Sequence, residues 1–317
     1  MLIPDLLTDI LQTMRLEHTI LCRCQLKAPW GIRFPADDGE ATFHVVTKGQ
    51  CWLQVEGHKE PLLLATGDFV MFPHGQEHIL SDTISSPITD FVDTAIMRPN
   101  HGYNQISFGG DGMEIELLAG CFTVRADRRN PLLSSLPKLI HIRSDRGQFI
   151  PWLETTLRYI TAELAISQLG FQTVIARLVD VLFIQAVRAY VDRISDDRRN
   201  WLRALTDPEI AIALSLMQRS PEKSWTVAEL AERIPMSRSA FSAKFTELVG
   251  QPPMQYLTTW RMIKATELLR ESRLGLKDIS SKVGYESEVS FSKAFKRWSG
   301  VAPSLYRQDY MRNLGVI

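Results

Sequence analysis

The chain has 317 residues, and its 36 Lys and Arg residues balance 36 Asp and Glu residues, so the formal net charge is zero. This length is enough for two or three domains, each with its own hydrophobic core. No apolar run reaches the roughly 20 residues that a membrane helix needs, and the first five residues lack the basic start of a signal peptide. We therefore expect a cytoplasmic protein that does not bind membranes.

The two parts of the chain carry opposite charges. Residues 201–317 contain 17 Lys and Arg against 12 Asp and Glu, whereas residues 1–200 contain 19 against 24. A basic module joined to an acidic one is typical of a nucleic-acid reader with a separate sensing domain. The four cysteines are Cys22, Cys24, Cys51 and Cys121. In a cytoplasmic protein we expect them to be reduced thiols.

A short helix is predicted over residues 5–16, and residues 21–124 then alternate between short β-like runs and turn signals. Three such runs are 42–46, 51–55 and 68–72. Many short strands at this spacing predict a barrel or a sandwich.

Apolar residues recur at helical spacing after residue 150. They predict one helix from Trp152 to Gln168 and a second from Phe171 to about Val191. The second helix is more apolar than one buried face requires, which indicates a surface covered either by the rest of the chain or by a second subunit. The highly polar stretch 195–200 predicts a linker, and the chain after Asp207 reads as helical.

A repeat of about fifty residues is the most informative pattern in the C-terminal part. Phe241, Phe245, Gly250, Pro253 and Tyr256 recur as Phe291, Phe295, Gly300, Pro303 and Tyr306. Each copy contains a short helix with an apolar stripe, a break, and a second helix rich in Ser, which is the pattern of a helix-turn-helix unit.

Local signals predict how each of these units is built. Ser237 and Ser287 can cap the second helices, and Gly284 can supply a turn with positive φ. A helix from Pro253 to Arg270 would be a rigid spacer between the two units. Such a spacer could set two helices in successive major grooves, about 34 Å apart along DNA.

The second helix of each unit has an exposed polar face. The first face presents Arg238, Ser239, Ser242, Ala243 and Thr246, and the second presents Glu288, Val289, Ser292, Lys293 and Lys296. Small polar residues let a helix lie deep in the major groove, and Arg can reach a guanine edge or a phosphate. Glu288 can accept from a cytosine amino group, and Val289 can touch a thymine methyl group.

Residues 225–306 resemble the AraC/XylS family of bacterial transcription regulators, most densely over 283–297 and 300–306. The resemblance implies that the second helix of each unit enters the major groove of double-stranded promoter DNA and that the protein touches RNA polymerase, as an activator does. It implies two groove-facing sets, Arg238, Ser239, Ser242 and Ala243 in the first unit and Glu288, Val289, Ser292 and Lys293 in the second. The near absence of Arg on both faces leaves the recognised bases open.

Residues 67–78 fit the pattern G-x5-P-x-G-x2-H and resemble the second cupin motif. The first cupin motif is incomplete, because Thr42 stands where its Glu is expected and the paired His residues upstream are missing. The alternative reading, a cupin-type metal-dependent enzyme with a helical appendage, is therefore disfavoured. The N-terminal half resembles the cupin sensor domain that one AraC-like subgroup carries.

Cys24, His44, His78 and Cys121 form the candidate sensor set. His44 faces the expected barrel interior because it lies two residues after Thr42. Two imidazoles and two thiolates would suit zinc if they converge, and the thiol pair would suit an oxidant such as hypochlorite. A pocket for a small organic ligand lined by Trp30, Phe43, Trp52 and Phe72, or a scaffold without an effector site, are the alternatives. Cys22 and Cys51 are left out because their parity differs from that of their neighbours.

The sequence thus predicts an α+β protein with three parts. Residues 1–145 form a cupin-like β-barrel sensor, 146–200 a helical connector that could also mediate homodimerisation, and 201–317 an all-α DNA-binding domain with two helix-turn-helix units. We expect a transcription regulator rather than an enzyme. An effector would act by shifting the population between different domain packings or dimer geometries.

Overall fold

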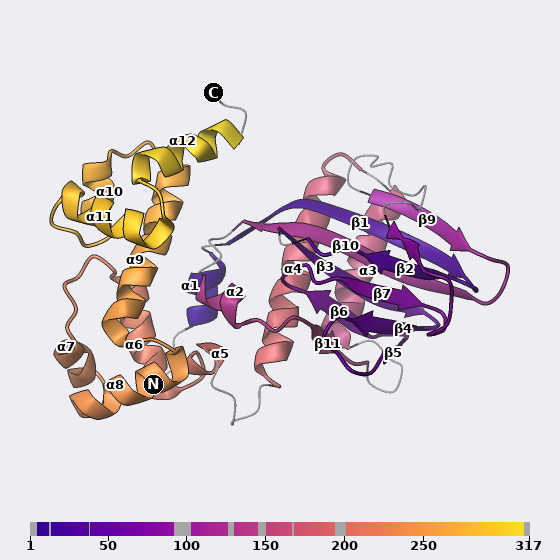
Figure 1. Ribbon diagram of the computed structural model, residues 1–317, viewed down its shortest axis with the longest axis horizontal. Coiled ribbons are helices and arrows are strands. Elements are labelled where there is room, and N and C mark those ends of the chain that lie inside the picture. The colour runs from indigo at the N-terminus through magenta and orange to yellow at the C-terminus, as the bar shows by residue number, and fades with distance from the viewer. Residues whose placement is uncertain are drawn as a thin grey trace. The chain divides into compact units, whose positions relative to one another are not determined.

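The computed structural model describes residues 5–12, 14–37, 39–91, 103–125, 130–144, 150–166, 168–193 and 201–313 (Figure 1). The chain divides into two compact units. One comprises Leu16–Arg125 and Leu136–Arg193, and the other comprises Met1–Arg15, Ala126–Ser135 and Ile194–Ile317. Each unit has its own hydrophobic core. The predicted domain boundaries at residues 145 and 200 stay a prediction.

The first unit is built on two β-sheets. Its strands are β1 (Arg15–Lys27), β2 (Gly31–Phe34), β3 (Glu40–Lys48), β4 (Gln50–Val55), β5 (Leu62–Ala65), β6 (Phe69–Phe72), β7 (His78–Ser81), β8 (Thr89–Asp90), β9 (Tyr103–Gly109), β10 (Glu114–Arg125) and β11 (Ile140–Ile142). One sheet has the strand order β11-β6-β3-β10-β1-β9 and the other β5-β4-β7-β2-β8. Apolar side chains from both sheets form one core, which confirms the predicted β-rich cupin region.

Two helices cover the outer face of the six-stranded sheet. They are α3 (Pro151–Ile166) and α4 (Phe171–Val191), and Figure 1 shows them running beside the strands. The rings of Phe69 and Trp152 lie 6.3 Å apart, and those of Phe122 and Phe183 lie 5.8 Å apart. Both helices agree with the predicted ranges, while the predicted linker over 195–200 lies outside the described residues.

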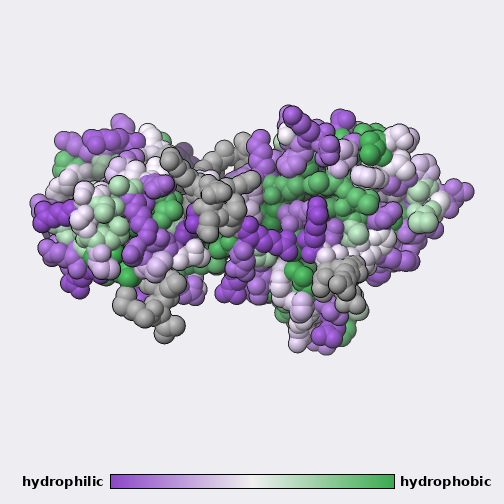
Figure 2. All heavy atoms as spheres, turned by 90° about the horizontal axis from the view of Figure 1, so that it is seen from below, coloured by the Kyte–Doolittle hydropathy of each residue, from purple (hydrophilic) through white to green (hydrophobic). Residues whose placement is uncertain are grey.

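Hydrophobic side chains also reach the surface of the sheet-containing unit. In Figure 2 they gather in an area bordered by hydrophilic residues. The exposed large hydrophobic residues of this unit include Tyr159 and Ile166 on α3 and Val174 and Val181 on α4. Since α4 also has a fully buried face, apolar residues occupy two sides of this helix.

The second unit is helical. It contains α1 (Leu6–Leu11), α2 (Pro131–Ser135), α5 (Trp201–Ala204), α6 (Pro208–Arg219), α7 (Val227–Glu232), α8 (Arg238–Val249), α9 (Pro253–Glu271), α10 (Leu276–Lys282), α11 (Glu288–Ser299) and α12 (Pro303–Asn313). Helix α1 packs on α6, and an ion pair of 3.4 Å joins Asp9 to Arg219. The first helix is shorter than predicted because β1 already begins at Arg15.

The repeated residues pack in the same way in both copies. The rings of Phe245 and Tyr256 lie 5.8 Å apart, and those of Phe295 and Tyr306 lie 5.4 Å apart. Gly250 and Gly300 end α8 and α11 with φ of 80° and 88°, in the left-handed region that glycine adopts without steric cost. The repeat therefore encodes two equivalent helix-turn-helix scaffolds.

None of the helices within the described ranges combines the length and hydropathy that crossing a bilayer would need.

Candidate functional site

Both second helices of the helix-turn-helix units begin at a serine cap. Ser237 Oγ accepts a hydrogen bond from the Ala240 N–H at 3.3 Å, and Ser287 Oγ accepts one from the Ser290 N–H at 3.1 Å. These contacts satisfy backbone donors that have no partner inside a helix. Both predicted caps are confirmed, and each fixes the residue at which α8 or α11 begins.

The reading faces of the two helices are placed equivalently. We define the reading face of α8 as Arg238, Ser239, Ser242 and Ala243, and the reading face of α11 as Glu288, Val289, Ser292 and Lys293. In each set the first, second and fourth residues are exposed and the third is half-buried. The opposite sides of the helices are anchored by phenylalanines that are fully buried. Val289 is 63% exposed, so an apolar side chain is available to contact a partner.

Arg261 on the spacer helix α9 contacts both the segment ahead of the first helix-turn-helix unit and the second unit. Its Nε donates to the Pro221 carbonyl at 2.7 Å, and its Nη2 donates to the Lys223 carbonyl at 2.9 Å, both ahead of the first unit. The same guanidinium lies 5.8 Å from the ring centre of Tyr285 in the second unit. Gly284 has φ of 80°, as predicted, and leaves room for this arginine. Arg261 therefore bonds the segment ahead of the first unit and contacts an aromatic ring of the second.

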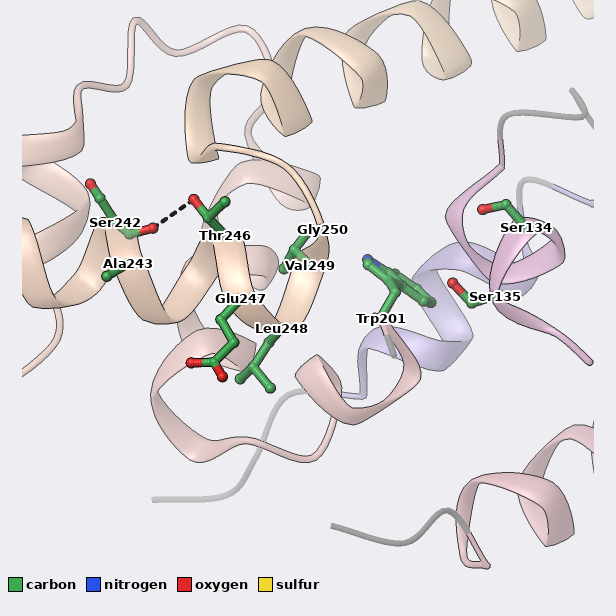
Figure 3. A pocket seen from close by; sticks show the side chains of 10 residues that line it. All are labelled: Ser134, Ser135, Trp201, Ser242, Ala243, Thr246, Glu247, Leu248, Val249 and Gly250. Carbon is green, nitrogen blue, oxygen red and sulfur yellow. Dashed lines mark hydrogen bonds between the residues drawn. The ribbon is translucent and has the colours of Figure 1, made fainter. Parts of the chain in front are cut away.

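A pocket of about 910 Å³ lies along α8 within the helical unit (Figure 3). Its lining includes Ser242 and Ala243 from the reading face of α8, and Ser134 and Ser135 from α2. Figure 3 shows the two residues of α8 at the end of the pocket away from α2, with Trp201 between them. These two residues of the reading face thus border open space.

His44 and His78 meet inside the β unit. Their Nε2 atoms lie 2.7 Å apart, and both residues are almost fully buried. His78 is the first residue of β7, after the turn that the cupin-like motif predicts. Its ring is sandwiched between Phe72 and Phe34, with ring centres at 3.9 and 4.8 Å.

The hydrogen bonds around the histidine pair define its protonation. Gln76 O lies 2.8 Å from His78 Nδ1, and since a carbonyl only accepts, Nδ1 carries the proton. His78 Nε2 is then an acceptor, and His44 Nε2 must donate to it. Burial lowers the pKa of His78 to about 4, and burial followed by repulsion from His78 lowers the pKa of His44. Both imidazoles are therefore neutral near pH 7, and His44 Nδ1 is a buried acceptor with no hydrogen-bond partner among the residues that the structure describes.

The four predicted sensor residues converge only in part. His44 and His78 are in contact, and Cys24 lines the same small cavity as His44. Cys121 instead interacts with Glu40 and with the backbone of Ile20. Within the described residues there is no group of three or more His, Cys, Asp or Glu side chains placed to hold a metal ion. The predicted zinc set of four residues is therefore not assembled in this arrangement.

Cys22 lies on the same side of β1 as Cys24, contrary to the parity for which it was left out of the predicted sensor set. Cys22 and Cys24 are two residues apart on β1, so their side chains project to the same side, and both belong to the inner core together with Cys51. A hydrogen bond with Cys22, and then burial, raises the pKa of the Cys24 thiol. Burial raises the pKa of Cys51 and of Cys121 to about 12. All three thiols are thus held protonated, which lowers their reactivity.

The predicted lining of an organic-ligand pocket is dispersed. Trp30 lines the interior cavity, but Phe43 points away from it toward Phe69 and Phe122, and Trp52 is partly exposed. Phe72 is buried against His78. The cavity measures about 10 Å³, which is room for about one water molecule.

Comparison with protein families identifies both units. Residues 5–192 match the Cupin family, and residues 230–309 match the Helix-turn-helix domain family. The chain belongs to the AraC family of transcription regulators, with an N-terminal cupin domain and a C-terminal helix-turn-helix domain.

Full-length relatives support the same assignment. The chain is 33% identical to an AraC-like transcription regulator of Streptomyces lividans, over 96% of this chain and 98% of that protein. It is 32% identical to the HTH-type transcriptional regulator AlkR of Acinetobacter baylyi, over 96% of this chain and 99% of that protein. These relatives are transcription regulators and not enzymes, as predicted.

Among solved structures, the DNA-binding domain of AdpA in complex with a target DNA is 31% identical to this chain. The match covers 34% of this chain and 96% of that domain, with a TM-score of 0.32.

Proposed function

We propose that the protein binds one class of promoter site by inserting the reading faces of α8 and α11 into the major groove of double-stranded DNA. The observation that carries the proposal is the equivalent exposure of these two faces on serine-capped helices with a common aromatic scaffold. A helix presented in this way fits the major groove, where base edges differ enough to be read.

The two reading faces differ in chemistry at every equivalent position but one. Arg238 stands opposite Glu288 in the repeat, Ser239 opposite Val289, and only Ser242 and Ser292 are the same. We therefore propose an asymmetric site, because Arg prefers guanine, Glu accepts from cytosine, and Val contacts a thymine methyl group.

The proposal is tested by fluorescence-anisotropy titration on the DNA upstream of the protein's own gene, at several salt concentrations. We expect sequence-selective binding whose affinity falls as salt rises, because bound counterions are released from phosphates. Lys293→Ala should weaken binding, while Lys59→Ala, which removes the same charge in the other unit, should not. Binding that is neither selective nor salt-dependent would rule out the proposal.

For the sensor we propose that a small species, an oxidant or a metal ion such as zinc, acts at His44, His78 and Cys24. Neutral imidazoles are the form that binds a metal, and within the described part of the chain no group bonds the buried Nδ1 of His44. The interior cavity of about 10 Å³ favours such a species over an organic molecule. In the described residues no three such side chains are placed to hold a metal ion, so zinc binding would require His44, His78 and Cys24 to move closer together and the Cys24 thiol to lose its proton. The raised pKa of Cys24 means that a direct oxidation would be slow.

Metal analysis and thiol titration test this part. We expect a metal or oxidant response in the wild type that Cys24→Ser removes and that Cys121→Ser leaves in place, because Cys121 has other partners. If the protein takes up no metal and Cys24→Ser still responds to hypochlorite in cells, the site is not the sensor.

We also propose that α4 forms a homodimer contact. Val174, Leu178 and Val181 follow one another at helical spacing on the side of α4 that is not buried in the core, and Val174 and Val181 are 42% and 40% exposed. Val181→Lys should yield a monomer in analytical ultracentrifugation, and Thr173→Lys on the same helix should not. A wild type that is monomeric at all concentrations would exclude the dimer.

Two further points follow from the family and are proposed here for this chain. A promoter-bound regulator would act in the cytoplasm, and it would activate transcription by touching RNA polymerase. Transcription in vitro from the bound promoter, with and without the protein, tests the second point. An unchanged or reduced transcript level would contradict activation.

A further inference from the structure

A second cleft lies outside the barrel, in the sheet-containing unit. It measures about 330 Å³ and opens between the outer face of the six-stranded sheet and the C-terminal half of α3. This volume is at the lower end of the range found for small-molecule sites. The interior cavity, about 10 Å³, belongs to the opposite face of the same sheet, so the two spaces are separate.

The floor of the cleft is formed by β10. The register between β10 and β3 shifts between Glu116 and Leu117, and three consecutive residues, Glu116, Leu117 and Leu118, line the cleft. Side chains alternate between the two faces of a strand, and Leu117 belongs to the inner core and also lines the interior cavity, so Glu116 and Leu118 supply the side chains of this wall. Thr47 Oγ1 donates to the Glu116 carbonyl at 3.0 Å, which satisfies this backbone group at the irregularity.

The polar end of the cleft holds an ion pair. Arg23 Nη2 and Glu116 Oε2 lie 3.0 Å apart, and the Glu116 side chain is only 19% exposed. Gln105, which pairs with Arg23 across β1 and β9, adds an amide to this end. Together these groups offer both donors and acceptors, and the charges of Arg23 and Glu116 cancel.

The other wall is apolar. Leu118 and Leu157 are more than nine-tenths buried, and Leu164 and Ala165 of α3 extend this wall along the helix. The cleft thus has a polar end of zero net charge and an apolar side, a combination that matches an amphipathic molecule with an uncharged head.

We propose that this cleft binds a neutral amphipathic molecule whose head group both accepts and donates a hydrogen bond, such as a medium-chain aliphatic amide. The amide carbonyl would accept from Arg23, its N–H would donate to Glu116, and the chain would lie against the leucines of β10 and α3. A carboxylate head would be repelled by Glu116 and an ammonium head by Arg23, and desolvating either charge costs free energy that a neutral head avoids.

This proposal stands apart from the sensor at the histidine pair and does not require DNA binding. It is tested on the full chain by isothermal titration calorimetry with octanamide, octanoate and octylamine. We expect saturable 1:1 binding of octanamide at least fivefold tighter than that of the other two. Hydrogen exchange should show added protection in β10 and α3 when octanamide is bound.

Variants separate this site from unspecific apolar binding. Ala165→Trp should fill the cleft and abolish octanamide binding, and Arg23→Met should weaken it at least fivefold. Arg33→Met is the matched control, because Arg33 has a similar exposure and also forms ion pairs, but lies in the other sheet. Equal affinity for all three head groups, no binding of any of them, or binding unchanged by Ala165→Trp would overturn the proposal. Each result is independent of whether the protein binds promoter DNA.

Discussion

His44 and His78 face each other in the β unit with 2.7 Å between their Nε2 atoms, and the Gln76 carbonyl determines which of the two rings donates. The pair is surrounded by aromatic rings and is almost fully buried. Protonating either ring would place a positive charge in this apolar setting, which is unfavourable. The pair therefore links the stability of the β unit to pH.

Stability should fall as the pH is lowered from about 6.5 to about 4. The pKa of His78 is about 4 in the folded chain and near 6.5 when unfolded. The unfolded state therefore binds more protons than the folded state between pH 6.5 and pH 4. The stability that depends on neutral His78 is fully present above pH 6.5 and is lost as the pH falls. The loss should approach about 1.4 kcal/mol per pH unit for each such histidine. Urea denaturation of metal-free protein at pH 7, 6 and 5 measures it.

The variant His78→Phe provides the comparison, since a phenyl ring can keep the stacking on Phe72 and Phe34 while removing the titrating group. The free energy of unfolding of the wild type minus that of the variant should decrease as the pH falls. A pH-independent difference would show that this histidine is not held neutral by burial.

Gly284→Ala should destabilise the helical unit. The residue has φ of 80°, and an added Cβ would lie 2.7 Å from Arg261 Nη2 and 2.9 Å from the Cα of Glu222. We expect a cost of about 2–3 kcal/mol, of which about 1 kcal/mol is backbone strain. Gly300→Ala is the matched control, because φ is 88° there but no atom lies within 4 Å of the new Cβ. Urea midpoints should therefore shift more for Gly284→Ala, and equal shifts would refute the close approach.

Much of the helical unit was predictable because its signals are local. The caps Ser237 and Ser287, the positive φ of Gly284 and the spacer helix each depend on residues within one or two turns. The duplication strengthened these signals, because Phe, Gly, Pro and Tyr positions matched in two copies.

The sensor site was harder to predict because it depends on strand register. By its position in the alternation along β10, Cys121 is expected to face the barrel interior. It pairs with Thr42 on β3, however, whereas Ala119, two residues earlier, pairs with His44. It therefore lies about 7 Å further along the strand, a shift that no local pattern reveals. Cys22 could have been found from its spacing to Cys24 on one strand. The grouping of α1 and α2 with the C-terminal helices depends on long-range packing and has no local signal.

Arg261→Met should loosen the connection between the two helix-turn-helix units. The variant loses two hydrogen bonds to the carbonyls of Pro221 and Lys223 but keeps most of the aliphatic side chain. Each bond to a charged donor contributes about 1.5–3 kcal/mol. We expect an unchanged helix content by circular dichroism and at least a tenfold loss of affinity for the full promoter site. Unchanged affinity would show that the spacer helix is held in place without this arginine.

We propose that the two unlike reading faces recognise two different parts of one DNA site. Selection of binding sites from random double-stranded DNA, with wild type, Arg238→Ala and Glu288→Ala, tests it most directly. We predict an asymmetric wild-type motif in which Arg238→Ala relaxes base preference in one half and Glu288→Ala in the other, about one helical turn away, each costing about 1–3 kcal/mol at the affected base pair. A symmetric motif, or two variants that relax the same half or neither half, would show that the two faces do not read separate halves of one site.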